Sequence, residues 1–176
     1  MIHTPFSQTS ILSFSQEAFA QFAQKARELD ERAFFNQQGE KWSPAAHVIH
    51  LTVSTNAARM AYTLPAFLVR MIGGRVQHSS CSYDELVSNY QRLLEAGGKA
   101  TGRYIPRKSA REFTQEQVIR RWEKAGDRYL AALSRFPEER LDCYQAPHPI
   151  LGKLTLRELA FFTAYHALHH CKGLNA

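Results

Sequence analysis

Two histidines near the end of the sequence, His166 and His170, have a spacing that suits shared chemistry. Residues four apart in a helix project from the same face, one turn from each other. Two imidazoles in this arrangement can bind one metal ion through their neutral nitrogens. Leu159 and Thr163 fall in the same helical row. The segment 155–171 is therefore predicted to be an amphipathic helix whose histidines continue the row that faces the core.

A third histidine, His50, falls in the middle of another helical row, which is predicted to face the core. The other members of that row are apolar: Ala46, Val53, Ala57, Met60 and Leu64. Three inward-facing imidazoles would repel one another if protonated, whereas one divalent cation can bind their neutral nitrogens. Three protein ligands leave a coordination position open for water or substrate, so the pattern indicates a catalytic rather than a structural metal site. The predicted ligands are His50, His166 and His170.

Each of these histidines also has a simpler interpretation. A single histidine on a helix is more often a hydrogen-bonded polar side chain or a surface group, and an HxxxH pair alone is a weak motif. His47 and His169 would replace the predicted ligands if the helical register differed by one turn; otherwise they face outward or lie behind the ligands. Cys171 points about 100° away from His170 around the helix, so we expect it to pack or to lie at the surface. The remaining histidines fall in predicted loops and are given no role: His3, His78 and His148.

The elements that must position these residues are predicted to be four long helices. The first spans residues 16–35, with Ser13 or Ser15 as its N-cap. The second begins after Ser43, whose hydroxyl can cap the helix, with Pro44 at the first position, where the missing N–H does no harm. A proline further along is predicted to kink or end this second helix.

The other two long helices begin with capping boxes, in which a hydroxyl and a carboxylate or amide satisfy free backbone N–H groups. The third helix covers residues 114–136, and its box consists of Thr114 and Gln117. The last helix carries the histidine pair described above, and its box consists of Thr155 and Glu158.

Two segments between the helices have a different character. Residues 75–113 are predicted to be a long insertion with a short helix over 83–96 and a basic loop over 97–112. The loop contains Lys99, Arg103, Arg107, Lys108 and Arg111. It can attract an anionic substrate, although most of its charges are expected to be simply solvated. The connector 142–154 contains two prolines and a glycine and is predicted to be a turn-rich loop rather than a strand.

The composition is that of one globular domain. The chain has 176 residues, of which 44% are hydrophobic and 22% charged, and this suits a single domain over residues 1–176. The formal net charge of +6 permits an anionic ligand but comes without the dense basic clusters of a dedicated nucleic-acid binder. Three widely spaced cysteines argue against a disulfide framework, and we recognise no secretory signal or membrane-spanning run. We therefore expect a cytoplasmic protein with no nucleic-acid or membrane partner.

Three stretches together resemble the DinB/YfiT-like metalloenzymes. WSPAAHVIHL places Trp42 and the pair His50–Leu51 at the offsets of that family's Trp-Ser/Thr-Pro opening and ligand histidine. HPILGKLTLREL is similar to the segment that leads into the family's last helix, and YHALHH matches its closing histidine pair. The resemblance covers residues 15–171. It implies an all-α, up-down-down-up four-helix bundle, with 75–113 as a long insertion between the second and third main helices and a divalent metal ion on the three predicted ligands.

The resemblance also implies a function. Relatives in this family include thiol-dependent transferases and isomerases that use low-molecular-weight thiols, commonly as homodimers. We expect a homodimeric, divalent-metal-dependent enzyme, a thiol-dependent S-transferase or hydrolase, that acts on a small molecule with zinc or nickel. Histidine ligands are also compatible with iron, manganese or copper. No general base is assigned, because no carboxylate lies at ligand spacing and Glu158 is explained as a capping residue.

Two other functions are consistent with the same residues. One is a non-catalytic metal-binding bundle, stress-related or sensor-like, in which the ion mainly stabilises the fold. The other is a basic module for nucleic acid, which would show steeply salt-dependent duplex binding.

Overall fold

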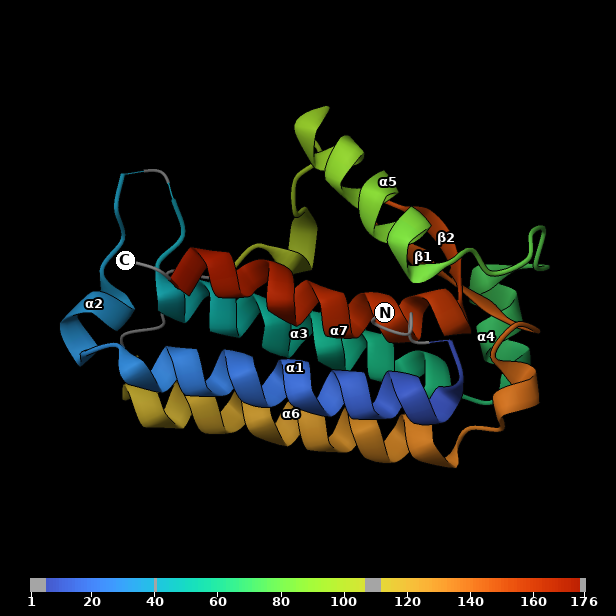
Figure 1. Ribbon diagram of the computed structural model, residues 1–176, viewed down its shortest axis with the longest axis horizontal. Helices are drawn as coiled ribbons and strands as arrows, with labels where there is room; N and C mark the ends of the chain where they lie inside the picture. Colours follow the sequence, from blue (N-terminus) through green and yellow to red (C-terminus); the bar gives the residue numbers. More distant parts are fainter. Residues whose placement is uncertain (1–5, 40, 107–111, 175–176) are drawn as a thin grey trace.

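Four long helices form a bundle in the computed structural model, which describes residues 6–39, 41–106 and 112–174 (Figure 1). They are α1 (Gln8–Glu28), α3 (Pro44–Thr63), α6 (Gln115–Arg135) and α7 (Leu156–Cys171). Each packs against two neighbours, in the order α1, α6, α3, α7 around the bundle. Figure 1 shows that α1 and α7 run in one direction and α3 and α6 in the other. The predicted all-α, up-down-down-up bundle is confirmed.

Shorter elements connect the long helices. They are α2 (Glu31–Phe35), α4 (Ala66–Gly73), α5 (Tyr83–Glu95), β1 (Gln145–His148), β2 (Gly152–Thr155) and the 3-10 turns η1 (Gly102–Tyr104), η3 (Glu138–Arg140) and η4 (Lys172–Leu174). α5 packs on α7, α4 packs on β1, and η1 contacts α3. Through α5 and η1, the described parts of the segment 75–113 thus lie against the two helices that carry the histidines. Within the described ranges, no helix combines the length and the apolar character that a bilayer crossing requires.

Most helix starts and stops follow the predicted local signals. Ser43 accepts a hydrogen bond from the backbone N–H of Ala46 at 3.3 Å, and Pro44 is the first helical residue of α3. Pro65 separates α3 from α4, as its missing N–H requires. Capping boxes open α5, α6 and α7 and consist of Ser82 with Glu85, Thr114 with Gln117, and Thr155 with Glu158.

The first predicted helix was wrong at its start and in its continuity. α1 begins at Gln8, where the hydroxyl of Ser7 accepts from the backbone N–H of Ser10 at 3.2 Å. Asp30 then caps a separate helix, α2, by accepting from the backbone N–H of Ala33 at 2.7 Å. Ser15 lies inside α1, where its hydroxyl donates to a backbone carbonyl one turn earlier. A serine that bonds back in this way is not available as a cap.

The connector before α7 was predicted to be a loop but forms a β-hairpin. β1 and β2 pair antiparallel, with Gln145 opposite Thr155 and Pro147 opposite Lys153. A two-stranded ribbon has free edges, so the missing N–H of an exposed proline costs little. The buried amide of Gln145 donates to the backbone oxygen of Gly73 at 2.9 Å. A Cβ at Gly73 would lie 1.8 Å from the backbone oxygen of Gln145, so only glycine lets α4 approach the hairpin this closely.

α7 is buried around its whole circumference, so the prediction of an amphipathic helix was also wrong. Every residue from Leu156 to Ala167 is buried, because α1, α3, α5 and the hairpin surround this helix. The two charged residues of its first turn, Arg157 and Glu158, are buried, and each has a partner. Arg157 contacts Asp142 at 2.8 Å, and Glu158 closes the capping box.

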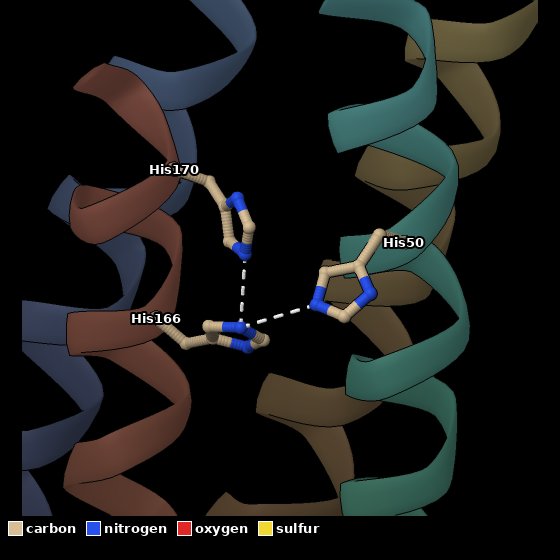
Figure 2. A group of neighbouring side chains, drawn as sticks. All are labelled: His50, His166 and His170. Atoms are coloured by element: carbon tan, nitrogen blue, oxygen red, sulfur yellow. Dashed lines mark hydrogen bonds between the residues drawn. The ribbon is translucent and has the colours of Figure 1, made fainter. Parts of the chain in front are cut away.

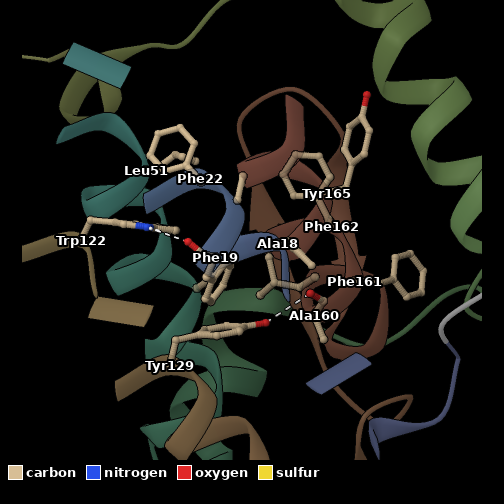
Figure 3. Close-up of a cluster of buried hydrophobic side chains, with 14 of the residues drawn as sticks. Ala18, Phe19, Phe22, Leu51, Trp122, Tyr129, Ala160, Phe161, Phe162 and Tyr165 are labelled. Carbon is tan, nitrogen blue, oxygen red and sulfur yellow. Dashed lines mark hydrogen bonds between the residues drawn. The ribbon is translucent and has the colours of Figure 1, made fainter. Parts of the chain in front are cut away.

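Aromatic side chains fill the space between α1, α3 and α6 (Figure 3). Trp122 and Tyr129 of α6 pack on Phe19 of α1, with ring centroids 5.0 and 5.8 Å apart. The polar atoms of these rings are satisfied, since Trp122 Nε1 donates to the Phe19 backbone oxygen at 3.4 Å and the Tyr129 hydroxyl to that of Ala160 at 3.3 Å. Close packing of this kind fixes the positions of the helices that it joins.

The row of α3 that contains His50 faces a cavity rather than this close-packed core. His50 itself is buried, but Met60 is 44% exposed, and Ala57 and Leu64 are half-buried. The core-facing residues lie on the adjacent side of α3 and are Val48, Leu51, Thr55, Ala58 and Tyr62. The prediction that the whole row packs in the core was therefore wrong, because apolar residues that line a cavity show the same spacing as residues that pack in a core.

Candidate metal centre

The three predicted ligands lie together where α3 and α7 face each other (Figure 2). His50 comes from α3, and His166 and His170 come from successive turns of α7. The Nε2 atom of His166 is 3.2 Å from Nε2 of His50 and 3.0 Å from Nε2 of His170. All three side chains are buried, with exposed fractions of 5%, 8% and 8%. The structure thus brings together imidazoles that are more than one hundred residues apart in the chain.

The arrangement of these nitrogens suits a divalent cation. Tetrahedral coordination with zinc–nitrogen bonds of 2.0–2.1 Å separates ligand nitrogens by roughly 3.3 Å, and two of the three separations here are 3.0 and 3.2 Å. Three converging lone pairs inside a protein are the donor set that such an ion requires. The residues present therefore fit a three-histidine metal site.

A backbone carbonyl fixes the orientation and tautomer of His50. Its Nδ1 atom lies 2.7 Å from the backbone oxygen of Tyr104, in η1. A carbonyl can only accept, so His50 carries its hydrogen on Nδ1, and the lone pair on Nε2 points to the other imidazoles. Metal-bound histidines commonly use such an outer acceptor to hold the ring. The predicted insertion thus contributes directly to the site.

A second histidine and a tryptophan hold His170. Nδ1 of His170 is 2.7 Å from Nδ1 of His47, so one of the two rings donates and the other accepts. The ring of Trp42 lies nearly parallel to that of His170, at 8° and a centroid distance of 6.3 Å. The chain beyond α7 passes close to His47, because a Cβ at Gly173 would lie 2.4 Å from its Nε2 atom. His47 therefore lies behind the predicted ligand His170. Of the two predicted positions, behind the ligands or facing outward, the structure shows the first.

The three clustered imidazoles are held in their neutral form. Burial, and after it the neighbouring histidines, places the pKa of His166 and of His170 well below the usual 6.5. Burial also lowers the pKa of His50, opposed by its hydrogen bond to the Tyr104 carbonyl. Since a neutral nitrogen is the metal-binding form, the site is prepared for a cation at neutral pH.

A cavity of about 570 Å³ opens beside the cluster. Its residues come from α3, α4, α5, α7, β1 and the segment around η1, and include Ala57, Leu64, Tyr90, Leu94, Ile105, His148 and Phe162. Most of the described lining is apolar, and none of it is acidic. Lys99 and Arg103 belong to the lining and are exposed at the rim. The predicted basic residues at 107, 108 and 111 lie outside the described residues.

Glu158 has the capping role that the sequence predicts, with additional partners. Burial alone would raise its pKa, but hydrogen bonds from Cys81 N–H, His78 and Thr155 N–H hold that pKa below its usual value. His78, in the loop before α5, donates to Glu158 Oε2 at 3.0 Å. These contacts join the start of α5 to the start of α7 and place neither residue near the histidine cluster.

His169, the other alternative ligand, lies outside the cluster. Its ring packs edge-on against Tyr90 at a centroid distance of 5.6 Å. Its Nδ1 atom is buried and has no hydrogen-bond partner among residues 6–39, 41–106 and 112–174.

Comparison with known proteins gives one match. The family model described as the DinB superfamily matches residues 12–172 of the chain. No curated protein and no solved structure matches it.

Proposed function

The chain belongs to the DinB superfamily, and from this premise we propose that it is a metal-dependent enzyme for a small-molecule substrate. The observation that supports the proposal is the position of three converging imidazole nitrogens at the wall of a cavity of about 570 Å³. A purely structural zinc site is closed by a fourth protein ligand. Here the described cluster offers three histidines as metal ligands and faces a cavity that can hold a small molecule. This arrangement favours catalysis over passive metal binding.

The proposed reaction is a thiol-dependent S-transfer or a hydrolysis, with zinc or nickel as the ion. When bound, a divalent ion supplies Lewis-acid chemistry that favours the deprotonated form of a thiol or a water. In this chain, His50, His166 and His170 would hold the ion, while the Tyr104 carbonyl and His47 keep two of these rings in place. The apolar residues of α3 and α5 exclude water from the space where the substrate would lie.

The cysteines that the structure describes do not bring a thiol into the cavity. Among the described residues, Cys81, Cys143 and Cys171 are all free, and burial raises the pKa of Cys81 to about 12. None of the three lines the cavity. A thiol in this reaction would therefore come from a separate small molecule, which is the class of partner that we propose.

The metal is tested by elemental analysis of protein purified without a histidine tag. We expect about one divalent ion per chain in the wild type and little in His50→Ala and His170→Ala. His78→Ala is the matched control, because this histidine lies outside the cluster and should leave the metal content unchanged. Equal metal content in all four proteins would refute the metal site.

The thiol is tested on the cobalt-substituted protein. Binding of a low-molecular-weight thiol at the ion would add a sulfur-to-metal band to the absorption spectrum. If no thiol changes the spectrum of protein that retains its cobalt, S-transfer is excluded, and hydrolysis or non-catalytic metal binding would have to be considered instead.

A further inference from the structure

A histidine that the mechanism does not use, His148, lines the same cavity from β1. Its ring packs edge-on against Phe162 at a centroid distance of 4.6 Å and faces Tyr90 at 6.4 Å. Phe162 in turn stacks on His166, at 5.3 Å and 25°. A single phenyl ring therefore separates His148 from the histidine cluster along the cavity wall.

The hydrogen bonds of His148 determine which of its nitrogens carries the hydrogen. The backbone N–H groups of Ile150 and Leu151 both donate to its Nδ1 atom, at 3.3 and 3.0 Å. Nδ1 must therefore be unprotonated, and in the neutral ring the hydrogen lies on Nε2. Burial lowers the pKa of His148 to about 4, so the neutral ring is the form present near pH 7. The Nε2–H group lies on the opposite edge of the ring from the turn, and no residue in the described part of the chain accepts its hydrogen bond.

The charges around the cavity favour an anionic acceptor for this donor. Lys99 and Arg103 line the cavity, whereas none of the lining residues that the structure describes is acidic. The residue before Lys99, Gly98, packs against the turn that follows His148, because a Cβ at Gly98 would be 3.3 Å from Cγ2 of Ile150. A carboxylate near His148 would gain both a hydrogen bond and a favourable electrostatic environment.

We propose that His148 is a substrate-recognition residue whose Nε2–H donates to a carboxylate of the substrate. The substrate class is then a small molecule with a metal-binding group at one end, an apolar body in the cavity and a carboxylate next to His148. A volume of about 570 Å³ suits one such molecule. This inference rests on the proposed function, because it places the other end of the substrate at the three clustered histidines.

Two substitutions separate recognition from the structural role of the ring. His148→Asn keeps an acceptor oxygen at the place of Nδ1, so it can still bind the N–H groups of Ile150 and Leu151, but it has no donor at the place of Nε2. His148→Gln keeps a donor at the place of Nε2 and loses the acceptor for the turn. If His148 only stabilises the turn, the Gln variant should be the impaired one; if it recognises a carboxylate, the Asn variant should be.

The probes are two series of simple thiols, titrated into the cobalt-substituted protein. One series consists of ω-mercaptoalkanoates of increasing chain length, and the other of 1-alkanethiols of the same lengths. In the wild type we expect one chain length at which the mercaptoalkanoate binds about tenfold more tightly, or more, than the matching alkanethiol. The preference should disappear in His148→Asn and persist in His148→Gln, while the affinity for alkanethiols stays the same in all three proteins.

The outcomes distinguish this inference from the proposal on which it rests. If both series bind the wild type equally at every length, or if His148→Asn keeps the preference, carboxylate recognition by His148 is overturned, and the thiol-binding metal site stands. If neither series changes the cobalt spectrum, the proposed thiol chemistry fails, and the inference fails with it. The wild-type comparison needs no variant, so poor folding of either substituted protein would not remove the test.

Discussion

The two sides of α3 differ in how they are packed. On the side that faces α1 and α6, Leu51 and Tyr62 contribute to a core in which Trp122 and Tyr129 are almost fully buried and every ring has a close neighbour (Figure 3). On the other side, apolar residues of the same helix border a cavity of about 570 Å³ next to His50.

The difference shows how a rigid site can exist beside open space. A cavity wall loses the contacts that hold side chains in place, so the positions of the imidazoles must be fixed from behind. α3 and α7 belong both to the close-packed core and to the histidine cluster. Hydrogen bonds to the Tyr104 carbonyl and to His47 then hold the rings of His50 and His170.

Removing the largest ring of the core should have the largest effect. Trp122→Ala would leave a void between α1 and α6 and is expected to lower the free energy of unfolding by about 3–5 kcal/mol. Urea denaturation measures this change. If the core fixes the site, the metal affinity of the folded variant should fall as well. A stable variant with wild-type metal affinity would contradict the link between the two sides of α3.

Removing the central imidazole should affect the cavity side alone. His166 faces both other nitrogens of the cluster, so His166→Ala should lower zinc affinity by on the order of a thousandfold. Competition with a chromophoric chelator measures that affinity. In the absence of metal, the free energy of unfolding of the variant should lie within about 1 kcal/mol of that of the wild type, because the ring borders the cavity. A large loss of stability in the absence of metal would show that His166 is a packing residue.

A smaller effect is expected at the ring behind His170. His47→Phe keeps an aromatic ring next to Trp42 but removes the partner of His170 Nδ1, and zinc affinity should fall about 10- to 100-fold. His169→Phe is the matched control, since this ring also packs against that of His170, at 5.2 Å, but forms no hydrogen bond with it within the described residues. Equal affinities for the two variants would show that the contact between His47 and His170 does not orient the ligand.

The smallest predicted effect is a pH dependence that originates at His148. Its pKa is lowered from 6.5 to about 4 by burial, so the unfolded chain takes up a proton first, and stability is lost as the pH falls from about 6.5 to 4. Between pH 7 and pH 5.5, metal-free wild type should lose about 1 kcal/mol more than metal-free His148→Asn. Urea titrations at the two pH values measure the difference. Equal losses of stability in the two proteins would show that the His148 ring is accessible to solvent and that its pKa is not lowered.

Local signals explain why much of this fold could be predicted from the sequence. Capping residues such as Ser43, Thr114 and Thr155 act within one turn of the helix that they start, so neighbouring residues suffice to identify them. The same holds for His166 and His170, whose spacing follows from helix geometry alone. His50 was identified because its row is otherwise apolar, even though that row lines a cavity.

The features that were missed depend on contacts between distant segments. Gln145 forms a strand instead of a loop because its amide binds the end of α4, more than seventy residues earlier in the chain. The acceptor for His50 is a backbone atom of Tyr104, which no side-chain pattern can indicate. His148 could have been singled out by its position just before the final capping box, but its tautomer depends on the turn that the hairpin forms.

The contact between His50 and the main chain at residue 104 has a consequence for how such proteins can diversify. The acceptor is a peptide oxygen, so it persists whatever side chain stands at that position, provided that the path of the backbone is kept. The neighbouring lining positions, including Arg103 and Ile105, can therefore change from charged to apolar side chains, or the reverse, without moving the imidazole of His50. Side-chain changes in this loop would then alter what the rim attracts and leave the three clustered histidines in place.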